Sequence, residues 1–292
     1  MKSMQGIWVP LVTPFRQGQV DLEAAQRLAA HLVEKGVHGL VVCGTTGEAC
    51  ALDEDEQQAM LDAVLAAVGR DCPVLMGIGG SDTRSVVAQA RRYCDHNLAG
   101  FLLPAPAYVR PSQEGLLRHF EAVAQNTDHD IVLYNIPYRT GVNIELPTLQ
   151  ALAANPRFVA IKECSGDTNQ LINFINETSL AVLGGDDAMI LPTLCLGGTG
   201  AIAAAAHIRP DLFVALYECV QRGNLAEARA INQLLLPLIR ILFSEPNPAP
   251  VKAALSREGW VEDELRLPMT NISTTCRNRL AQIMENLEGV RV

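Results

Sequence analysis

Several residue patterns that signal particular chemistries are missing from this chain of 292 residues. Its eight cysteines include no C-x-x-C pair, and its six histidines include no H-x-H or H-E-x-x-H spacing. Neither a dithiol redox motif nor a metal site is therefore predicted, and no cofactor is expected. We interpret the cysteines as buried thiols of a protein in the reducing cytoplasm.

Positively charged residues and long apolar segments are also scarce. The net charge of -9 and the pI near 5.2 argue against nucleic acid or an anionic membrane as the main partner. The longest uncharged stretch, residues 188–208, has the length of a membrane span. Pro192, Gly197 and Gly200 predict that it divides into a helix, a turn and a strand instead. Residues 1–15 lack the apolar segment of a secretory signal.

Short apolar runs alternate with segments of helical period along most of the chain. We expect eight strands, at Ile7–Thr13, Gly39–Cys43, Val74–Ile78, Phe101–Leu103, Ile131–Asn135, Val159–Lys162, Ala181–Gly184 and Ala201–Ala203. We expect helices between them at Leu22–Glu34, Glu54–Val68, Thr83–His96, Glu114–Gln125 and Asn169–Asn176. This alternation predicts an α/β fold, a TIM (β/α)8 barrel. The alternative is a doubly wound open sheet, but its G-x-G-x-x-G fingerprint is absent after the first strand.

The pattern becomes purely helical after Arg209-Pro210. Helices are expected at Asp211–Gln221, Ala226–Phe243 and Pro250–Glu258, and from about Thr275 onward. We therefore predict a catalytic barrel domain over residues 1–222 and a C-terminal helical extension over residues 223–292.

Lys162 is the residue that points most directly to chemistry, since the chain has only four lysines. It ends an apolar stretch, residues 158–161, where a buried ammonium is costly. Adjacent Glu163 would point to the opposite strand face and is a poor partner. Desolvation lowers the pKa of a lysine and makes the neutral amine abundant, as Schiff-base chemistry on a carbonyl requires. The alternative is a structural lysine whose ammonium reaches backbone carbonyls or a distant carboxylate.

Polar residues follow three other predicted strands, and the carboxyl ends of barrel strands form the active face. Gly44-Thr45-Thr46-Gly47-Glu48 could turn tightly and present backbone N–H groups and two hydroxyls to a carboxylate or phosphate. Its alternative is an ordinary glycine-rich turn. Tyr134 could relay protons, and Arg139 could hold a second carboxylate. A core tyrosine and a solvated arginine are the alternatives there. Tyr108 stands on a proline-rich loop, where exposed aromatic residues are more often subunit contacts than catalysts.

With these motifs the chain resembles the family of 4-hydroxy-tetrahydrodipicolinate synthase (dihydrodipicolinate synthase) and N-acetylneuraminate lyase. These are pyruvate-binding class I aldolases on a (β/α)8 barrel. The resemblance runs from Val12-Thr13-Pro14 to Pro246-Asn247-Pro248 and Arg266-Leu267-Pro268-Met269. It rests chiefly on residues 44–48, on the segment from Tyr134 to Arg139 and on Lys162-Glu163.

The resemblance implies a role for each matching residue. Lys162 would form an imine with pyruvate, and Thr46 with the adjacent amides would hold the pyruvate carboxylate. Tyr134 would donate and accept protons, linked through Thr45 to Tyr108 of a neighbouring subunit. Arg139 would receive the carboxylate of the aldehyde substrate. Gly185 and Ile202 would line the pocket through backbone groups. The substrates would be small molecules, pyruvate and aspartate semialdehyde, and the protein would be a homo-oligomer, most often a tetramer in this family.

Two other functions stay open at this point. Thr45-Thr46 and Arg139 favour the synthase, which serves lysine and diaminopimelate synthesis, over a pyruvate-dependent lyase or dehydratase of a sugar acid. A barrel that only senses a keto acid would not need the proton relay of Tyr134, Thr45 and Tyr108. The chain departs from the usual family sequence at Ala107-Tyr108-Val109, at Glu163-Cys164-Ser165 and over residues 203–207.

Feedback inhibition by lysine is not expected, although the resemblance suggests it. Lysine-inhibited bacterial members bind lysine through two histidines, an asparagine, a glutamate and a tyrosine. The matching positions here are Glu54, Gln57, Ser81, Ser85 and Ala107. Ser85 lacks the carboxylate that would pair with the ammonium of lysine, and Ala107 lacks the ring.

Overall fold

Eight parallel strands form the framework of the protein. The computed structural model describes residues 4–70 and 72–290. The strands are β1 (Gly6–Pro10), β4 (Gly39–Val42), β5 (Val74–Gly77), β6 (Gly100–Pro104), β7 (Ile131–Asn135), β8 (Phe158–Glu163), β9 (Ala181–Gly184) and β10 (Gly200–Ile202). Their order is that of a closed barrel, β1-β10-β9-β8-β7-β6-β5-β4, as the alternating pattern predicts.

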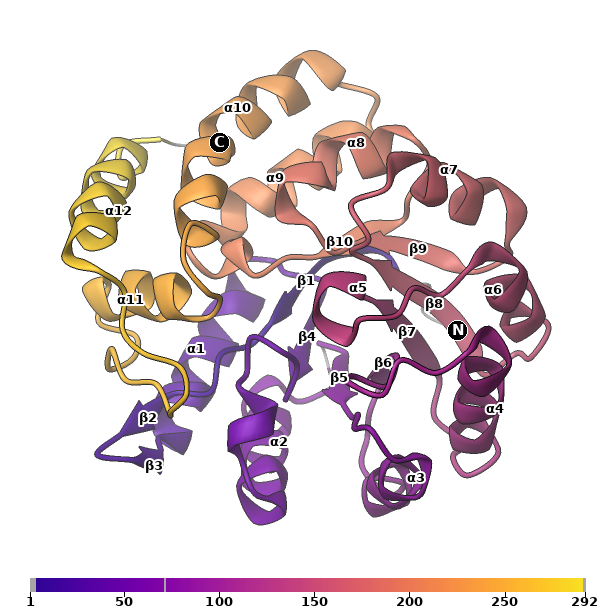
Figure 1. Ribbon diagram of the computed structural model, residues 1–292. Helices are drawn as coiled ribbons and strands as arrows, with labels where there is room; N and C mark the ends of the chain where they lie inside the picture. Colours follow the sequence, from indigo (N-terminus) through magenta and orange to yellow (C-terminus); the bar gives the residue numbers. More distant parts are fainter. Residues whose placement is uncertain (1–3, 71, 291–292) are drawn as a thin grey trace. The chain divides into compact units, whose positions relative to one another are not determined.

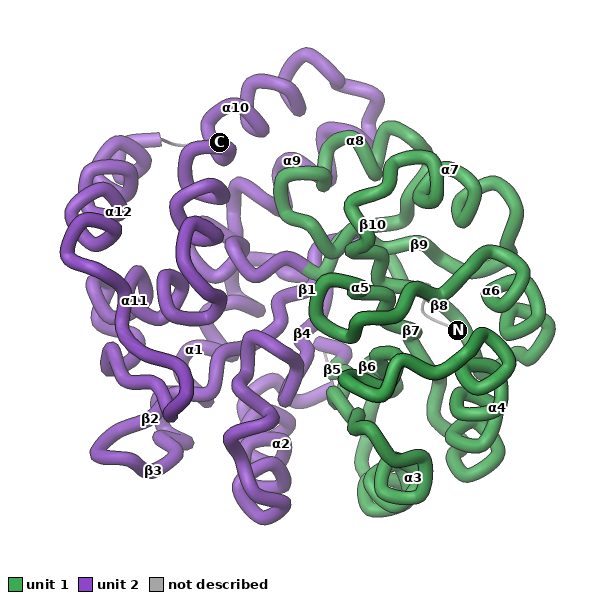
Figure 2. The backbone as a smooth tube through the Cα atoms, viewed as in Figure 1, with its two compact units in different colours: residues 1–5, 74–202 green, residues 6–73, 203–292 purple. Residues whose placement is uncertain are grey.

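The chain divides into two compact units (Figure 2). Unit 1 comprises Met1–Gln5 and Val74–Ile202, and unit 2 comprises Gly6–Pro73 and Ala203–Val292. The C-terminal extension over residues 223–292 falls entirely within unit 2. The predicted boundary at residue 222 separates a barrel from a helical extension. The division into two units does not test this boundary, which stays a prediction.

Unit 1 contains strands β5 to β10. Its helices are α3 (Thr83–Arg92), α4 (Gln113–Ala124), α5 (Pro137–Thr140), α6 (Leu146–Ala153), α7 (Thr168–Glu177), η2 (Asp187–Met189) and α8 (Ile190–Cys195). Helices α4, α6 and α7 lie side by side along one side of the strands (Figure 1). All five residues of β7 are buried, as in parallel strands covered on both faces. The pairing of β7 with β8 sets Tyr134 opposite Lys162.

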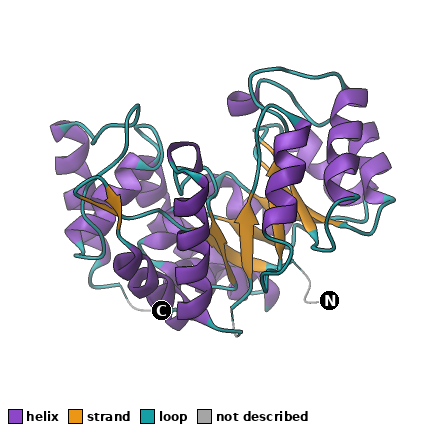
Figure 3. Ribbon diagram, turned by 90° about the horizontal axis from the view of Figure 1, so that it is seen from below, coloured by secondary structure: helices purple, strands orange, loops and turns teal. Residues whose placement is uncertain are grey.

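Unit 2 contains the parallel pair β1 and β4 and most of the longer helices. These are α1 (Leu22–Glu34), η1 (Ala49–Ala51), α2 (Glu54–Val68), η3 (Ala205–His207), α9 (Pro210–Gln221), α10 (Leu225–Leu242), α11 (Ala249–Arg257) and α12 (Thr274–Leu287). A short hairpin of β2 (Phe15–Arg16) and β3 (Gln19–Val20) lies apart from the parallel pair, in orange at the left of Figure 3.

Polar side chains fix where several helices begin. The side chain of Asp53 accepts hydrogen bonds from the first turn of α2, and the Glu56 carboxylate accepts one from the Asp53 amide. Asp21, Asp82 and Asp167 cap α1, α3 and α7 in the same way. Such caps satisfy amides that the helix itself leaves without partners.

Most of the predicted elements are present, with shifted ends. Residues 188–208 contain the expected helix, turn and strand as α8, residues 196–199 and β10, and they also include most of η2 and all of η3, which were not predicted. Among the described residues, no helix has both the length and the apolar character needed to cross a membrane. The prediction that the cysteines are buried was wrong for three of them, since Cys50, Cys94 and Cys195 are exposed.

Candidate active site

Lys162 lies at the end of β8 and is only 6% exposed. Burial lowers the pKa of its amine, because the ammonium loses water. Cys164 and Asp187 act in the opposite direction, and the positive charge of Arg139 lowers the pKa further. The net effect favours the neutral amine, which is the form that attacks a carbonyl.

Tyr134 lies directly beside this amine. The Nζ atom of Lys162 is 4.4 Å from the centroid of the Tyr134 ring. Tyr134 is itself buried, and its side chain is hydrogen-bonded to that of Cys164. Burial raises the pKa of the Cys164 thiol to about 12, so this group stays protonated at neutral pH. The strand pairing thus places a nucleophile next to a phenol that can transfer protons.

Gly185 packs against the side chains of Lys162 and Cys164. A Cβ atom at this position would lie 2.7 Å from Cε and 2.9 Å from Cγ of Lys162, and closer still to the sulfur of Cys164. Only glycine leaves room for both side chains as the structure places them. The Gly185 amide donates a hydrogen bond to the Glu163 carbonyl at 2.9 Å. This bond links the residue after β9 to the last residue of β8. Ile202, also predicted to line the pocket, ends β10 and is buried.

Glu163 has partners of its own and is not the counter-ion of Lys162. Its carboxylate accepts hydrogen bonds from Asn135 Nδ2 at 2.9 Å, from the Ser165 amide at 2.7 Å and from Gln170 Nε2 at 3.3 Å. Burial nevertheless raises the pKa of Glu163. These bonds engage the Glu163 carboxylate away from Lys162, and the expectation that the two side chains lie on opposite strand faces stays a prediction.

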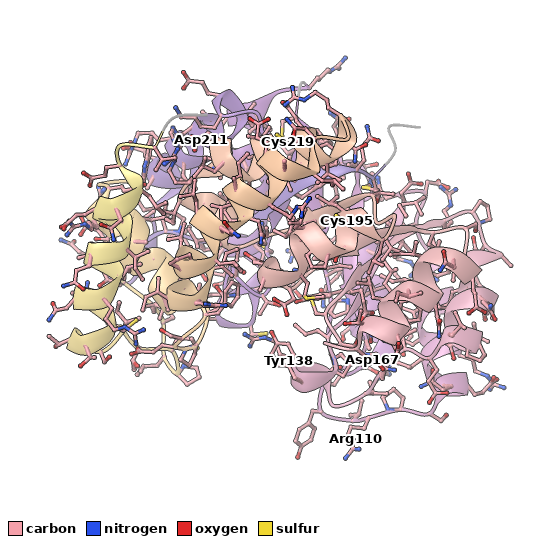
Figure 4. The ribbon with its side chains drawn as sticks, turned by 90° about the horizontal axis from the view of Figure 1, so that it is seen from above. Arg110, Tyr138, Asp167, Cys195, Asp211 and Cys219 are labelled. Atoms are coloured by element: carbon pink, nitrogen blue, oxygen red, sulfur yellow. The ribbon has the colours of Figure 1, made fainter. Side chains whose placement is uncertain are left out.

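Arg139 and Tyr108 both lie at the surface of unit 1. Arg139 is in α5 and is exposed, with its Cζ atom 5.4 Å from the centroid of the Tyr138 ring. Tyr108 is 91% exposed, and its backbone has a left-handed φ of 72°. Arg110 is on the same loop as Tyr108 and donates from Nε to the carbonyl of Gly141, which follows α5. Arg110 lies at the edge of the protein in Figure 4. In a single chain, the Tyr108 ring therefore makes little contact with protein.

Thr45 and Thr46 belong to unit 2, in the turn after β4. Thr45 is exposed and Thr46 is only 3% exposed. The Gly47 and Glu48 amides donate to the Gly44 and Thr45 carbonyls, so they are used within the turn. These two amides are therefore not available to the predicted carboxylate cradle over residues 44–48.

A buried ion pair secures this turn. Glu48 Oε1 lies 2.5 Å from Nζ of Lys252, and the Lys252 side chain is fully buried. The Glu48 backbone has a left-handed φ of 52°, which is uncommon outside glycine. Lys252 Nζ also lies 4.1 Å from the centroid of the Phe15 ring and donates to the Glu264 carbonyl. Burial lowers the pKa of Lys252, whereas Glu48 raises it.

Sequence reasoning missed the ion pair of this turn and also a bond to it from the extension. Asn247, in the extension, donates from Nδ2 to the Thr46 hydroxyl at 3.0 Å. Asn247 stood out only as part of the Pro246-Asn247-Pro248 motif, which gave no role for its side chain.

In the described residues, no group of three or more His, Cys, Asp or Glu side chains could hold a metal ion.

Comparison with known proteins places this site in a family. The sequence profile of the Dihydrodipicolinate synthetase family matches residues 3–287. The chain belongs to this family. It is 39% identical over 291 residues to a 4-hydroxy-tetrahydrodipicolinate synthase from a Cyanothece species, covering 98% of this chain and 99% of that protein. It is 38% identical over 284 residues to the synthase named likewise from Syntrophus aciditrophicus, covering 97% and 98%.

A solved structure of the family agrees with the fold. The dihydrodipicolinate synthase of Cyanidioschyzon merolae, solved with lysine bound, superposes with a TM-score of 0.94 at 37% identity. The match covers 97% of this chain and 98% of that one. The α/β barrel predicted from the sequence is therefore the fold of this family member.

Proposed function

We propose that this protein is a 4-hydroxy-tetrahydrodipicolinate synthase, which condenses pyruvate with aspartate semialdehyde. The observation that carries the proposal is the buried Lys162 with its amine over the Tyr134 ring, in a chain of the dihydrodipicolinate synthetase family. The names of the full-length relatives support the synthase over a sugar-acid lyase.

The reaction begins at the neutral amine of Lys162. Its nitrogen attacks C2 of pyruvate to give a carbinolamine, which loses water to form the imine. Loss of a proton from C3 gives the enamine, whose C3 then attacks the aldehyde carbon of aspartate semialdehyde. The aldehyde oxygen takes up a proton as the carbon–carbon bond forms. The amino group of the adduct finally attacks the imine carbon, which closes the ring and releases Lys162.

Other side chains supply the protons and bind the carboxylates. Tyr134 lies beside the amine and serves as proton donor and acceptor, linked to Thr45 and to Tyr108 of a neighbouring subunit. Thr46 binds the pyruvate carboxylate and Arg139 the carboxylate of the aldehyde. Gly185 and Ile202 line the pocket with backbone groups.

We propose a homo-oligomer, at least a dimer and most simply the tetramer of the family, and the exposure of Tyr108 supports an oligomer. Tyr108 is 91% exposed in a single chain, and its ring needs a neighbouring subunit to take part in a relay. Light scattering combined with activity at the same concentration tests this assignment. A fully active monomer would remove Tyr108 from the mechanism. We also place the protein in the cytoplasm, where its eight free cysteines remain reduced.

Trapping the imine tests the function. Pyruvate and borohydride should add a reduced adduct to the peptide that contains Lys162. Lys162→Arg should give no adduct and almost no turnover, because a guanidinium stays protonated. The matched control is Lys35→Arg, at an exposed helix end, which should behave like the unaltered protein. An adduct elsewhere, or none in the unaltered protein, would refute the proposal.

A further inference from the structure

The Thr46 hydroxyl is held by a residue from the C-terminal extension. Thr46 is 3% exposed, and Asn247 Nδ2 lies 3.0 Å from its Oγ1. An amide N–H can only donate, so the Thr46 oxygen accepts this bond. The hydroxyl proton must then point to a different acceptor.

We propose that Asn247 is a positioning residue that aims the Thr46 hydroxyl proton at the carboxylate of pyruvate. The inference rests on the proposed function, in which Thr46 binds that carboxylate. A hydroxyl can rotate and can use its proton on any nearby acceptor. A donor fixed on its oxygen restricts the rotation and leaves the proton for a carboxylate, which accepts hydrogen bonds only.

The turn itself is held without Asn247. The Thr13 hydroxyl donates to the Gly47 carbonyl at 2.6 Å. Glu48 pairs with Lys252 at 2.5 Å and accepts from the Arg266 amide at 3.2 Å. Removing the Asn247 amide should therefore free the Thr46 side chain and leave the backbone of the turn in place.

The oxygen of the Asn247 side-chain amide, unlike its nitrogen, gives no reason for an asparagine at this position. This Oδ1 atom is buried and has no hydrogen-bond partner among the described residues. A buried acceptor without a partner is costly, so packing alone would favour an apolar side chain at this position. The bond from Nδ2 to Thr46 is the polar contact of this side chain that the structure shows.

The test compares two carbonyl compounds at Lys162. Borohydride trapping is measured with pyruvate and with acetaldehyde, which also forms an imine but has no carboxylate. In Asn247→Ala, the pyruvate concentration for half-maximal trapping should rise about tenfold, the equivalent of one charge-assisted hydrogen bond. The value for acetaldehyde should stay the same. Gln233→Ala, at an exposed position of α10, is the control for a change within the extension.

A double variant shows whether Asn247 acts through Thr46. Thr46→Val should weaken pyruvate trapping, and adding Asn247→Ala should weaken it no further. Additive effects would overturn the inference, as would equal weakening for both carbonyl compounds. Asn247→Leu keeps the side-chain volume and replaces the alanine variant if that one does not fold. Loss of the fold in both would show that Asn247 holds the structure instead, which also overturns the inference.

These outcomes separate the inference from the proposed function. If pyruvate leaves no adduct on Lys162 in the unaltered protein, the function itself is wrong. If the adduct forms but Asn247→Ala does not discriminate between pyruvate and acetaldehyde, only the role of Asn247 fails.

Discussion

Replacing Gly185 by alanine should disable Lys162 without unfolding the protein. The new Cβ atom would meet the lysine side chain at 2.7 Å from Cε and 2.9 Å from Cγ, and would meet the Cys164 sulfur closer still. Distances below about 3 Å force a neighbour to move. The Cys164 sulfur is the nearest of these atoms, so the Cys164 and Lys162 side chains would both have to shift.

The size of the effect follows from the cost of overpacking. Inserting a methyl group into a well-packed site typically costs about 1–3 kcal/mol. If this cost raises the free energy of the Lys162 side chain in its reactive conformation, imine formation should weaken by about 5- to 150-fold. The overall stability should fall by no more than the same amount.

Gly184→Ala offers a matched control at the preceding residue. Its Cβ would lie 3.1 Å from Thr193 Oγ1 and 3.4 Å from the next nearest atoms, so its three nearest neighbours all belong to Thr193 and none to Lys162. Borohydride trapping with pyruvate and urea unfolding are measured on both variants. Equal trapping by Gly185→Ala and Gly184→Ala would refute the claim that Gly185 makes room for the lysine.

Three further predictions concern other parts of the protein. Tyr134→Phe should keep the fold but lose about 10²- to 10⁴-fold in turnover, and unchanged steady-state rates would exclude the phenol from proton transfer. His207 is fully buried, its Nε2 accepts from the Val12 amide, and burial lowers its pKa from 6.5 to about 4. Its neutral ring therefore adds about 3 kcal/mol of stability above pH 6.5, which is lost as the pH falls toward 4. Urea unfolding at pH 7 and 4.5 should show this loss in the unaltered protein and less of it in His207→Gln. Lysine at about 1 mM should inhibit by less than half, because Ser85 and Ala107 lack the expected charge and ring. Half-inhibition at lower concentration in initial-rate assays would contradict that expectation.

The sequence predicted the strands well where apolar runs stand between clear breaks. Ile131–Asn135 and Ala181–Gly184 have the predicted bounds, since each is a short apolar run that leads into polar or glycine-rich chain. Helix α6 (Leu146–Ala153) was not predicted. It has only eight residues and its N-cap Glu145 makes no side-chain hydrogen bond, so the proline in its first turn is its main start signal.

Site residues were predictable where a reactive type of side chain stands at the end of an apolar strand. Lys162 stands out because a lysine at the end of an apolar strand needs an explanation. The contact between Asn247 and Thr46 could not be predicted, because 201 positions separate the two residues along the chain. No local pattern encodes a side-chain pair at that separation, and only the folded extension brings the two together.

The ion pair of Glu48 and Lys252 bears on the synthesis of the chain. Glu48 needs a countercharge in the folded protein, because one member of a buried pair left alone is strongly destabilising. Lys252 follows it by 204 positions (252 minus 48). At about 5–20 residues per second, a ribosome takes roughly 10–40 s to cover that distance. The nascent turn must therefore stay solvated, or be shielded by a chaperone, until the extension has been translated.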